Sequence, residues 1–219
     1  MKRVKRPRLK KTLISLGLVL LWTLLVCYPD PRVFFRNFAR LRHFPVDPSV
    51  AKRIGAPLPK NGPALEELVT GRLVRYEYDW RLYGVPWYFP TPEEVARARR
   101  GDCESRAVLL ASLLAAQKIP FTVKASLTHM WVDYPGKRSN AMENDKVRWL
   151  YRDEKGFHFR WPREVRGIEF LRLQKEGLWD VAPLSRRLLL ALGWVGIPLV
   201  VFASLRHWGP SRAGSGKHS

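Results

Sequence analysis

Two uncharged apolar runs lie near the ends of the chain, over residues 12–29 and 188–205, and each contains 18 residues. An α-helix rises ~1.5 Å per residue, so each run would extend about 27 Å, close to the thickness of a bilayer core. Arg186, Arg187 and Arg206 flank the second run, where they would lie among lipid headgroups. The pattern predicts two transmembrane helices, over 12–29 and 187–205.

Between these runs, the apolar positions first follow helical spacing. Thr91 and Glu94, with a proline between them, form a complete helix start with a capping box. We expect that helix to stop at Gly101 and a second helix to begin near Cys103. One buried face is predicted for the second helix, because its apolar residues recur at spacings of three and four: Ala107, Val108, Leu110, Ala111, Leu114 and Ala115.

The following segments have the alternation and turn residues of β-strands. Residues 121–126 and 129–134 are β-prone and closely connected, and 147–151 and 157–161 flank a turn that contains Gly156. Two helices followed by about four strands indicate an α+β fold rather than alternating βαβ units. Helices packed on an antiparallel sheet are therefore expected.

Charge suggests how the chain is organised around a membrane. Lys and Arg number 39 against 19 Asp and Glu. Residues 1–11 carry seven basic side chains and residues 30–44 carry four, which favours a cytoplasmic N-terminus. A poor cleavage sequence after the first run favours a retained anchor over a signal peptide. The expected order is a basic N-terminus (1–11), a span (12–29), a juxtamembrane linker without sustained periodicity (30–61), an extracytoplasmic domain (62–186), a second span (187–205) and a cytoplasmic tail (206–219).

The excess of positive charge, +20 overall, also bears on partners. A basic domain held close to a bilayer is expected to contact anionic lipid or a cell-wall polymer. No zinc-finger spacing, aromatic RNA-binding motif or basic leucine zipper is present, so nucleic acid is not an expected partner.

Cys103 is the candidate nucleophile. It follows Gly101-Asp102 at the expected first turn of a helix, where free N–H groups and the helix dipole would lower the pKa of a thiol and could hold an oxyanion. A base is needed as well, and His129, at the start of an expected strand, is the nearest histidine after it.

A third group should orient the histidine. The candidates beyond the turn at residues 135–136 are Asn140, Glu143 and Asp145. Asp133 is the weakest geometrically, because four residues along one strand would put it ~13 Å from His129.

Residues 91–137, with "GDCE" opening a helix and "HMWVD" opening a strand, resemble the core of the bacterial transglutaminase-like superfamily of papain-fold thiol enzymes. The resemblance covers about residues 60–160. It implies a transglutaminase-like or papain-like α+β domain in which Cys103 is the nucleophile and His129 the base. The third member of the triad does not map directly. Glu143 is favoured for its place after Ala141-Met142, and Asp145 and Asn140 are alternatives. Trp80 or Trp87 is a candidate for the oxyanion side of the cleft.

The sequence thus predicts a two-pass protein of a bacterial inner membrane whose thiol acts on peptide or protein amides by hydrolysis or acyl transfer. The alternative is an inactive domain of the same fold that serves as a binding or scaffold module. No cofactor is expected. A metal site is not expected either, because the acids flanking Cys103 have no second ligand cluster at suitable spacing.

Overall fold

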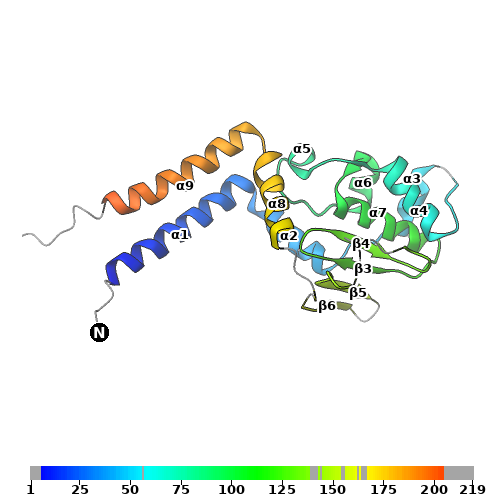
Figure 1. The fold of residues 1–219 in the computed structure, drawn as a ribbon. Coiled ribbons are helices and arrows are strands. Elements are labelled where there is room, and N and C mark those ends of the chain that lie inside the picture. Colours follow the sequence, from blue (N-terminus) through cyan, green and yellow to red (C-terminus); the bar gives the residue numbers. More distant parts are fainter. Residues whose placement is uncertain are drawn as a thin grey trace, which may run out of the picture. The chain divides into compact units, whose positions relative to one another are not determined.

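The computed structural model describes residues 6–55, 57–138, 143, 145–153, 156–161, 163 and 167–204. The chain divides into two compact units (Figure 1). One comprises Met1–Pro31 with Pro183–Ser219, and the other comprises Arg32–Ala182.

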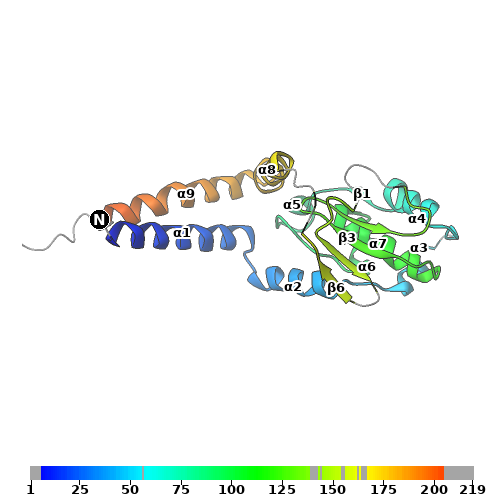
Figure 2. The same cartoon turned by 60° about the horizontal axis from the view of Figure 1, so that its bottom comes forward.

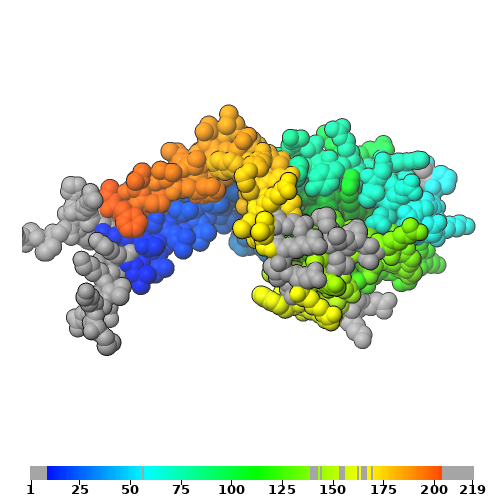
Figure 3. All heavy atoms as spheres, in the orientation of Figure 1, coloured from blue at the N-terminus to red at the C-terminus, as the bar shows by residue number. Residues whose placement is uncertain are grey.

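The first unit is a pair of long helices, α1 (Arg6–Cys27) and α9 (Leu184–Ser204). They pack side by side, as the blue and orange helices of Figure 3 show. The Trp22 indole donates a hydrogen bond to the carbonyl of Leu189 (2.8 Å), and the Trp194 indole donates one to the Thr23 hydroxyl (2.9 Å). Gly193 permits this approach, because a Cβ atom there would lie 2.0 Å from the Trp22 ring.

Both helices are long and apolar enough to cross a membrane, over Leu9–Cys27 and Leu184–Ala203. Most of their leucines are exposed in the unit, as expected for side chains that meet lipid. The two helices expected from the apolar runs are therefore present.

The second unit begins with α2 (Pro31–Arg42), followed by the short turns η1 (Pro48–Val50) and α3 (Ala51–Ile54). The sequence suggested a linker here, because no apolar period is sustained. The reason for the difference is that α2 is held to the domain by polar groups. The fully buried Asn37 amide donates to the carbonyl of Trp87 (2.7 Å) and accepts from the N–H of Phe89 (3.1 Å).

The helical layer continues with α4 (Gly62–Leu68), η2 (Val69–Leu73), α5 (Asp79–Leu82) and α6 (Pro92–Ala98). The predicted capping box is confirmed: Thr91 caps α6, and Glu94 bonds back to the Thr91 N–H. The helix ends at Ala98, with Arg99 as its C-cap, three residues before the expected stop. Residues Arg100–Gly101 then form β2, which pairs in parallel with β1 (Arg75–Tyr76).

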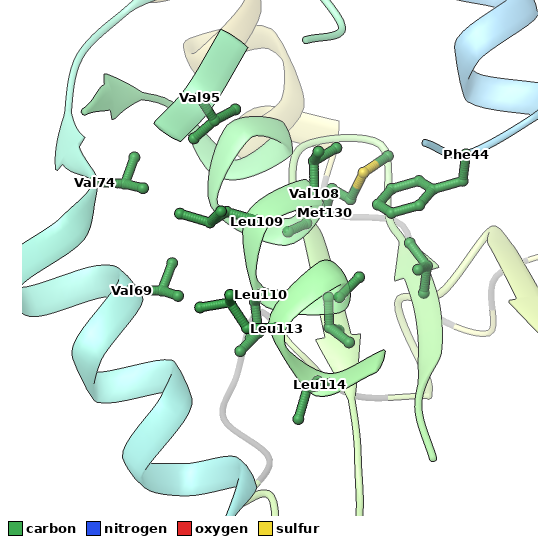
Figure 4. Close-up of a cluster of buried hydrophobic side chains, with 14 of the residues drawn as sticks. Phe44, Val69, Val74, Val95, Val108, Leu109, Leu110, Leu113, Leu114 and Met130 are labelled. Carbon is green, nitrogen blue, oxygen red and sulfur yellow. The ribbon is translucent and has the colours of Figure 1, made fainter. Parts of the chain in front are cut away.

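Helix α7 (Cys103–Ala116) lies at the centre of the core. In Figure 4, Val69 and Val74 face it from one side, and Phe44 and Met130 lie on the other. Leu109 and Leu113 are buried along with the predicted apolar positions, so α7 is buried all round and the expectation of a single buried face was wrong. The reason is that α4, α6 and the sheet all pack against it.

The four-stranded sheet has the order β4-β3-β5-β6, with every neighbouring pair antiparallel. Its strands are β3 (Thr122–Ala125), β4 (Met130–Asp133), β5 (Leu150–Asp153) and β6 (Gly156–Phe159). Val123, Ala125, Met130 and Val132 lie on the face toward α7 and are buried. Helix α8 (Gly167–Lys175) and the turn η3 (Glu176–Asp180) complete the unit. The predicted α+β class is confirmed, and both expected strand pairs are antiparallel neighbours. Gly156 is the first residue of β6 rather than part of the turn, so that detail was wrong. Figure 2 shows the same unit from a second side.

Candidate active site

The local sequence fixes Cys103 at the start of α7. Gly101 has φ +155°, and a Cβ atom there would lie 2.1 Å from the Ser105 hydroxyl, so glycine is required. Asp102 caps the helix, with its side chain accepting from the Ser105 N–H (3.4 Å). Cys103 is therefore the first residue of α7, as the sequence predicted, and its side chain is partly buried.

His129 is positioned by the tight turn between β3 and β4. The Ser126 side chain accepts the N–H groups of Thr128 (3.2 Å) and His129 (3.0 Å), and the Ser126 N–H donates to the His129 carbonyl (2.8 Å). The His129 ring stacks on Trp131, two residues further along the same face of the strand, with centroids 6.2 Å apart. These contacts fix the orientation of the imidazole.

Glu143 is the acid that meets this histidine: its Oε1 lies 2.9 Å from His129 Nε2. The other oxygen, Oε2, lies 3.2 Å from Lys137 Nζ. Burial would raise the pKa of the Glu143 carboxyl, but the hydrogen bonds and charges of His129 and Lys137 prevail and hold that pKa below its usual value. Glu143 is thus an ionised orienting group for the ring.

The alternatives to Glu143 lie elsewhere. Asp145 is 61% exposed and pairs with Lys124 (3.0 Å) and Arg148 (3.1 Å) rather than with the histidine. Asp133 also pairs with Lys124. Asn140 lies outside the described residues.

Lys137 is a site residue that the sequence reasoning missed. Its ammonium is almost fully buried and lies between Glu143 and Glu66, and the Tyr134 hydroxyl donates to the same Glu66. A hydrogen-bonded chain therefore runs from α4 to the imidazole. Only its position just beyond the turn at residues 135–136 could have drawn attention to Lys137.

The electrostatics around the thiol differ from the expectation. The Cys103 Sγ donates to Glu104 Oε2 (2.9 Å), and burial together with the carboxyls of Glu104 and Asp102 raises the pKa of the thiol well above its usual value. The main-chain N–H of Met130, next to His129, acts in the opposite sense by favouring the thiolate. The lowered pKa predicted from the helix N-terminus alone was wrong, because burial and then the nearby carboxyls outweigh the helix dipole.

Asp79 adds a further buried carboxyl to this neighbourhood. Its Oδ2 accepts the Tyr88 N–H (2.6 Å), and its buried Oδ1 has no hydrogen-bond partner in the described part of the chain. Burial first, and then the charge of Glu104, raises the pKa of Asp79 well above its usual range. The same two causes, with Asp79 as a third, raise the pKa of Asp102. The carboxyls of Asp79 and Asp102 therefore favour their protonated forms.

The two tryptophan candidates, Trp80 and Trp87, donate their indole N–H groups to different partners. The Trp87 indole donates to Glu104 Oε1 (3.1 Å), the carboxyl that also bonds Cys103, so Trp87 belongs to the surroundings of the thiol. The Trp80 indole donates instead to the carbonyl of Gly177 (2.8 Å). An indole has one N–H, so Trp80 is a structural residue in this arrangement and does not offer a donor to an oxyanion.

In this structure the Cys103 thiol is hydrogen-bonded to Glu104 and the His129 imidazole to Glu143, so proton transfer between thiol and imidazole would require the side chains to rearrange. In the described ranges, no hydrogen bond joins Cys103 to His129. With Nε2 bound to Glu143, Nδ1 is the ring nitrogen that would exchange a proton with sulfur. Catalytic hydrogen bonds often tighten only when substrate binds. Within the same ranges, no group of three His, Cys, Asp or Glu side chains is arranged to hold a metal ion.

Comparison of the chain with family models, with curated proteins and with solved structures gave no match.

Proposed function

We propose that this chain is a membrane-tethered thiol enzyme of the transglutaminase-like type that acts on amide bonds of peptides or proteins. The hydrogen bond between His129 and Glu143 carries the proposal. It holds an oriented imidazole at the turn that precedes Met130, whose N–H lies by the Cys103 sulfur. Nucleophile, base and orienting acid are the three parts that thiol acyl transfer needs.

In the proposed reaction, the Cys103 proton passes to His129 Nδ1 and the sulfur adds to the amide carbonyl. The C–N bond then breaks, and the leaving amine or ammonia takes the proton from the imidazolium. A thioester remains on Cys103. Attack by water or by a second amine, with its proton taken up by His129, releases the acyl group and restores the thiol. The first N–H groups of α7 would support the oxyanion, while the single N–H of Trp87 stays on Glu104.

The two apolar helices favour a location in the plasma membrane, and the greater basic charge of residues 1–11 favours an extracytoplasmic domain of a bacterial inner-membrane protein. Substrates would then be amides accessible at the outer surface, with an anionic cell-wall polymer as a further candidate partner.

Burst kinetics with p-nitrophenyl acetate test the acyl-enzyme directly. The full chain in nanodiscs should release a burst of p-nitrophenol and gain one acetyl group on the peptide that contains Cys103. Cys103→Ser should abolish the burst, while Cys27→Ser, which changes the other cysteine, should retain it. A burst of equal size in both variants would contradict the proposal. A primary amine added to the assay would then distinguish the two reactions: transamidation gives the acetylated amine, and hydrolysis gives acetate.

A second candidate is a binding or scaffold module with the same fold. The hydrogen bond from Cys103 to Glu104 favours it, because a thiol held protonated by carboxyls is a poor nucleophile. The absence of any burst from the native chain would support this candidate.

A further inference from the structure

One face of the Arg32–Ala182 unit exposes aromatic side chains together with arginines. On α2, Phe35 and Phe38 are at least half exposed. The same exposed arc of the helix carries Arg32, Arg36 and Arg42. The polar Asn37 points inward instead, so α2 has its aromatic residues outside and an amide inside. Such a face is unsuited to water and typical of a helix that lies in a membrane interface.

The β5–β6 hairpin continues this face. Phe157, Phe159 and Trp161 alternate along β6 and its extension, and they are 43% to 70% exposed. Trp149 packs against the last two, with ring centroids 6.0 and 5.8 Å away. Residues 149–161 contain three basic and two acidic side chains.

Helix α2 and the hairpin are neighbours in both ribbon views (Figures 1 and 2). A shared groove between them is lined by Phe38, Leu41, Arg42, His43, Arg152 and Phe157. The two sets of exposed aromatics therefore form a single aromatic-basic surface, which we define as α2 with residues 149–153 and 156–161.

We propose that this aromatic-basic surface binds the headgroup layer of an anionic bilayer. Two observations identify the occupant. Helix α2 begins at Pro31, only four residues after α1 ends at Cys27. It therefore follows an apolar helix of membrane-spanning length almost directly in the sequence. No acidic residue occurs in α2, so its charge complements anionic headgroups. The aromatic rings would enter the interface while the guanidinium groups meet phosphates.

A single fluorescent label on α2 tests the proposal in the full chain. The background carries Cys27→Ala and Cys103→Ala, so the result is independent of thiol chemistry. Ala39→Cys, in the exposed arc of α2, takes an environment-sensitive dye. Arg97→Cys, exposed on α6, takes the same dye as the matched control. The chains are placed in nanodiscs that contain nitroxide lipids, whose quencher sits high on the acyl chain.

In nanodiscs rich in phosphatidylglycerol, we expect the label at position 39 to be quenched at least about twofold more than the label at position 97. Purely zwitterionic nanodiscs, or Phe35→Ser with Phe38→Ser, should reduce that quenching. Equal quenching at both positions, or the same quenching in both lipids, would overturn the proposal. A change in dye emission caused only by soluble polyanion, without lipid quenching, would assign the surface to a polymer and also overturn it.

Discussion

The Lys137 ammonium lies 3.2 Å from Glu143 Oε2, and the other oxygen of that carboxylate lies 2.9 Å from His129 Nε2. Glu66 holds the lysine from the opposite side. Lys137 thus acts as a positioning residue, since it reaches the imidazole only through Glu143. The orientation of the histidine depends on α4 as well as on its own hairpin.

Lys137→Met should destabilise the folded chain, because it leaves Glu66 and Glu143 without their shared cation. The expected loss is about 2–3 kcal/mol in the free energy of unfolding, measured by denaturant titration in detergent. Arg97→Met removes a surface pair with Glu93 and should change the free energy by no more than about 0.5 kcal/mol. Similar small losses in both variants would show that Lys137 does not support Glu143.

Glu104→Gln should make Cys103 more reactive. The charge of Glu104 is a cause of the raised thiol pKa, second only to burial, and the variant removes that charge while keeping the shape of the side chain. Alkylation by iodoacetamide at neutral pH should accelerate by about three- to tenfold. Glu93→Gln, an exposed acid on α6, is the control and should leave the rate unchanged. An unaltered rate in Glu104→Gln would contradict the electrostatic description of the thiol.

Gly101→Ala should damage the start of α7, because the new Cβ would clash with Ser105 and φ +155° is unfavourable for alanine. We expect a loss of about 2 kcal/mol in the free energy of unfolding, together with altered Cys103 reactivity. Gly71→Ala meets no atom within 4 Å and serves as the control, measured by the same denaturant titration. Equal effects would mean that the glycine before Asp102 has no special role.

Asp102→Asn should flatten the dependence of stability on pH. The folded-state pKa of Asp102 is raised, so its contribution to stability is fully present below the unfolded pKa of about 4 and is lost as pH rises through the folded pKa. Asparagine cannot ionise but still caps α7. Denaturant titrations over a pH series should therefore show a smaller fall toward high pH in the variant.

Asp47 is a control whose contribution to stability depends on pH in the opposite sense, because hydrogen bonds from Ser49 lower its pKa. Its contribution is present above the unfolded pKa and is lost as pH falls, so Asp47→Asn should weaken stability at neutral pH only. Parallel pH curves for Asp102→Asn and the native chain would refute the account of the buried acids.

Local signals were sufficient for the features set by short-range chemistry. The Thr91 capping box and the helix start at Cys103 depend on residues within a few positions of each other. The choice of Glu143 among three candidates also agrees with the contact in the structure.

The remaining parts depend on residues that are far apart in the chain. Glu66 reaches Lys137 across 71 positions, and Asp79 comes to the acids near Cys103 only through folding. Helix α2 escaped notice because its inward anchor is Asn37, which an apolar pattern does not reveal. The raised thiol pKa comes first from burial, which depends on how the domain packs around Cys103 and which a helix N-terminus alone does not indicate.

The pairing of Cys103 with His129 is tested most directly by the rate of iodoacetamide alkylation across pH. All chains are placed in nanodiscs and carry Cys27→Ser, which leaves Cys103 as the single thiol. The parent chain is compared with His129→Ala and with His158→Ala, the matched control on β6. The account predicts that removing the imidazole in His129→Ala slows alkylation, and that His158→Ala reacts at the same rate as its parent. The same ordinary thiol profile in all three chains would contradict it.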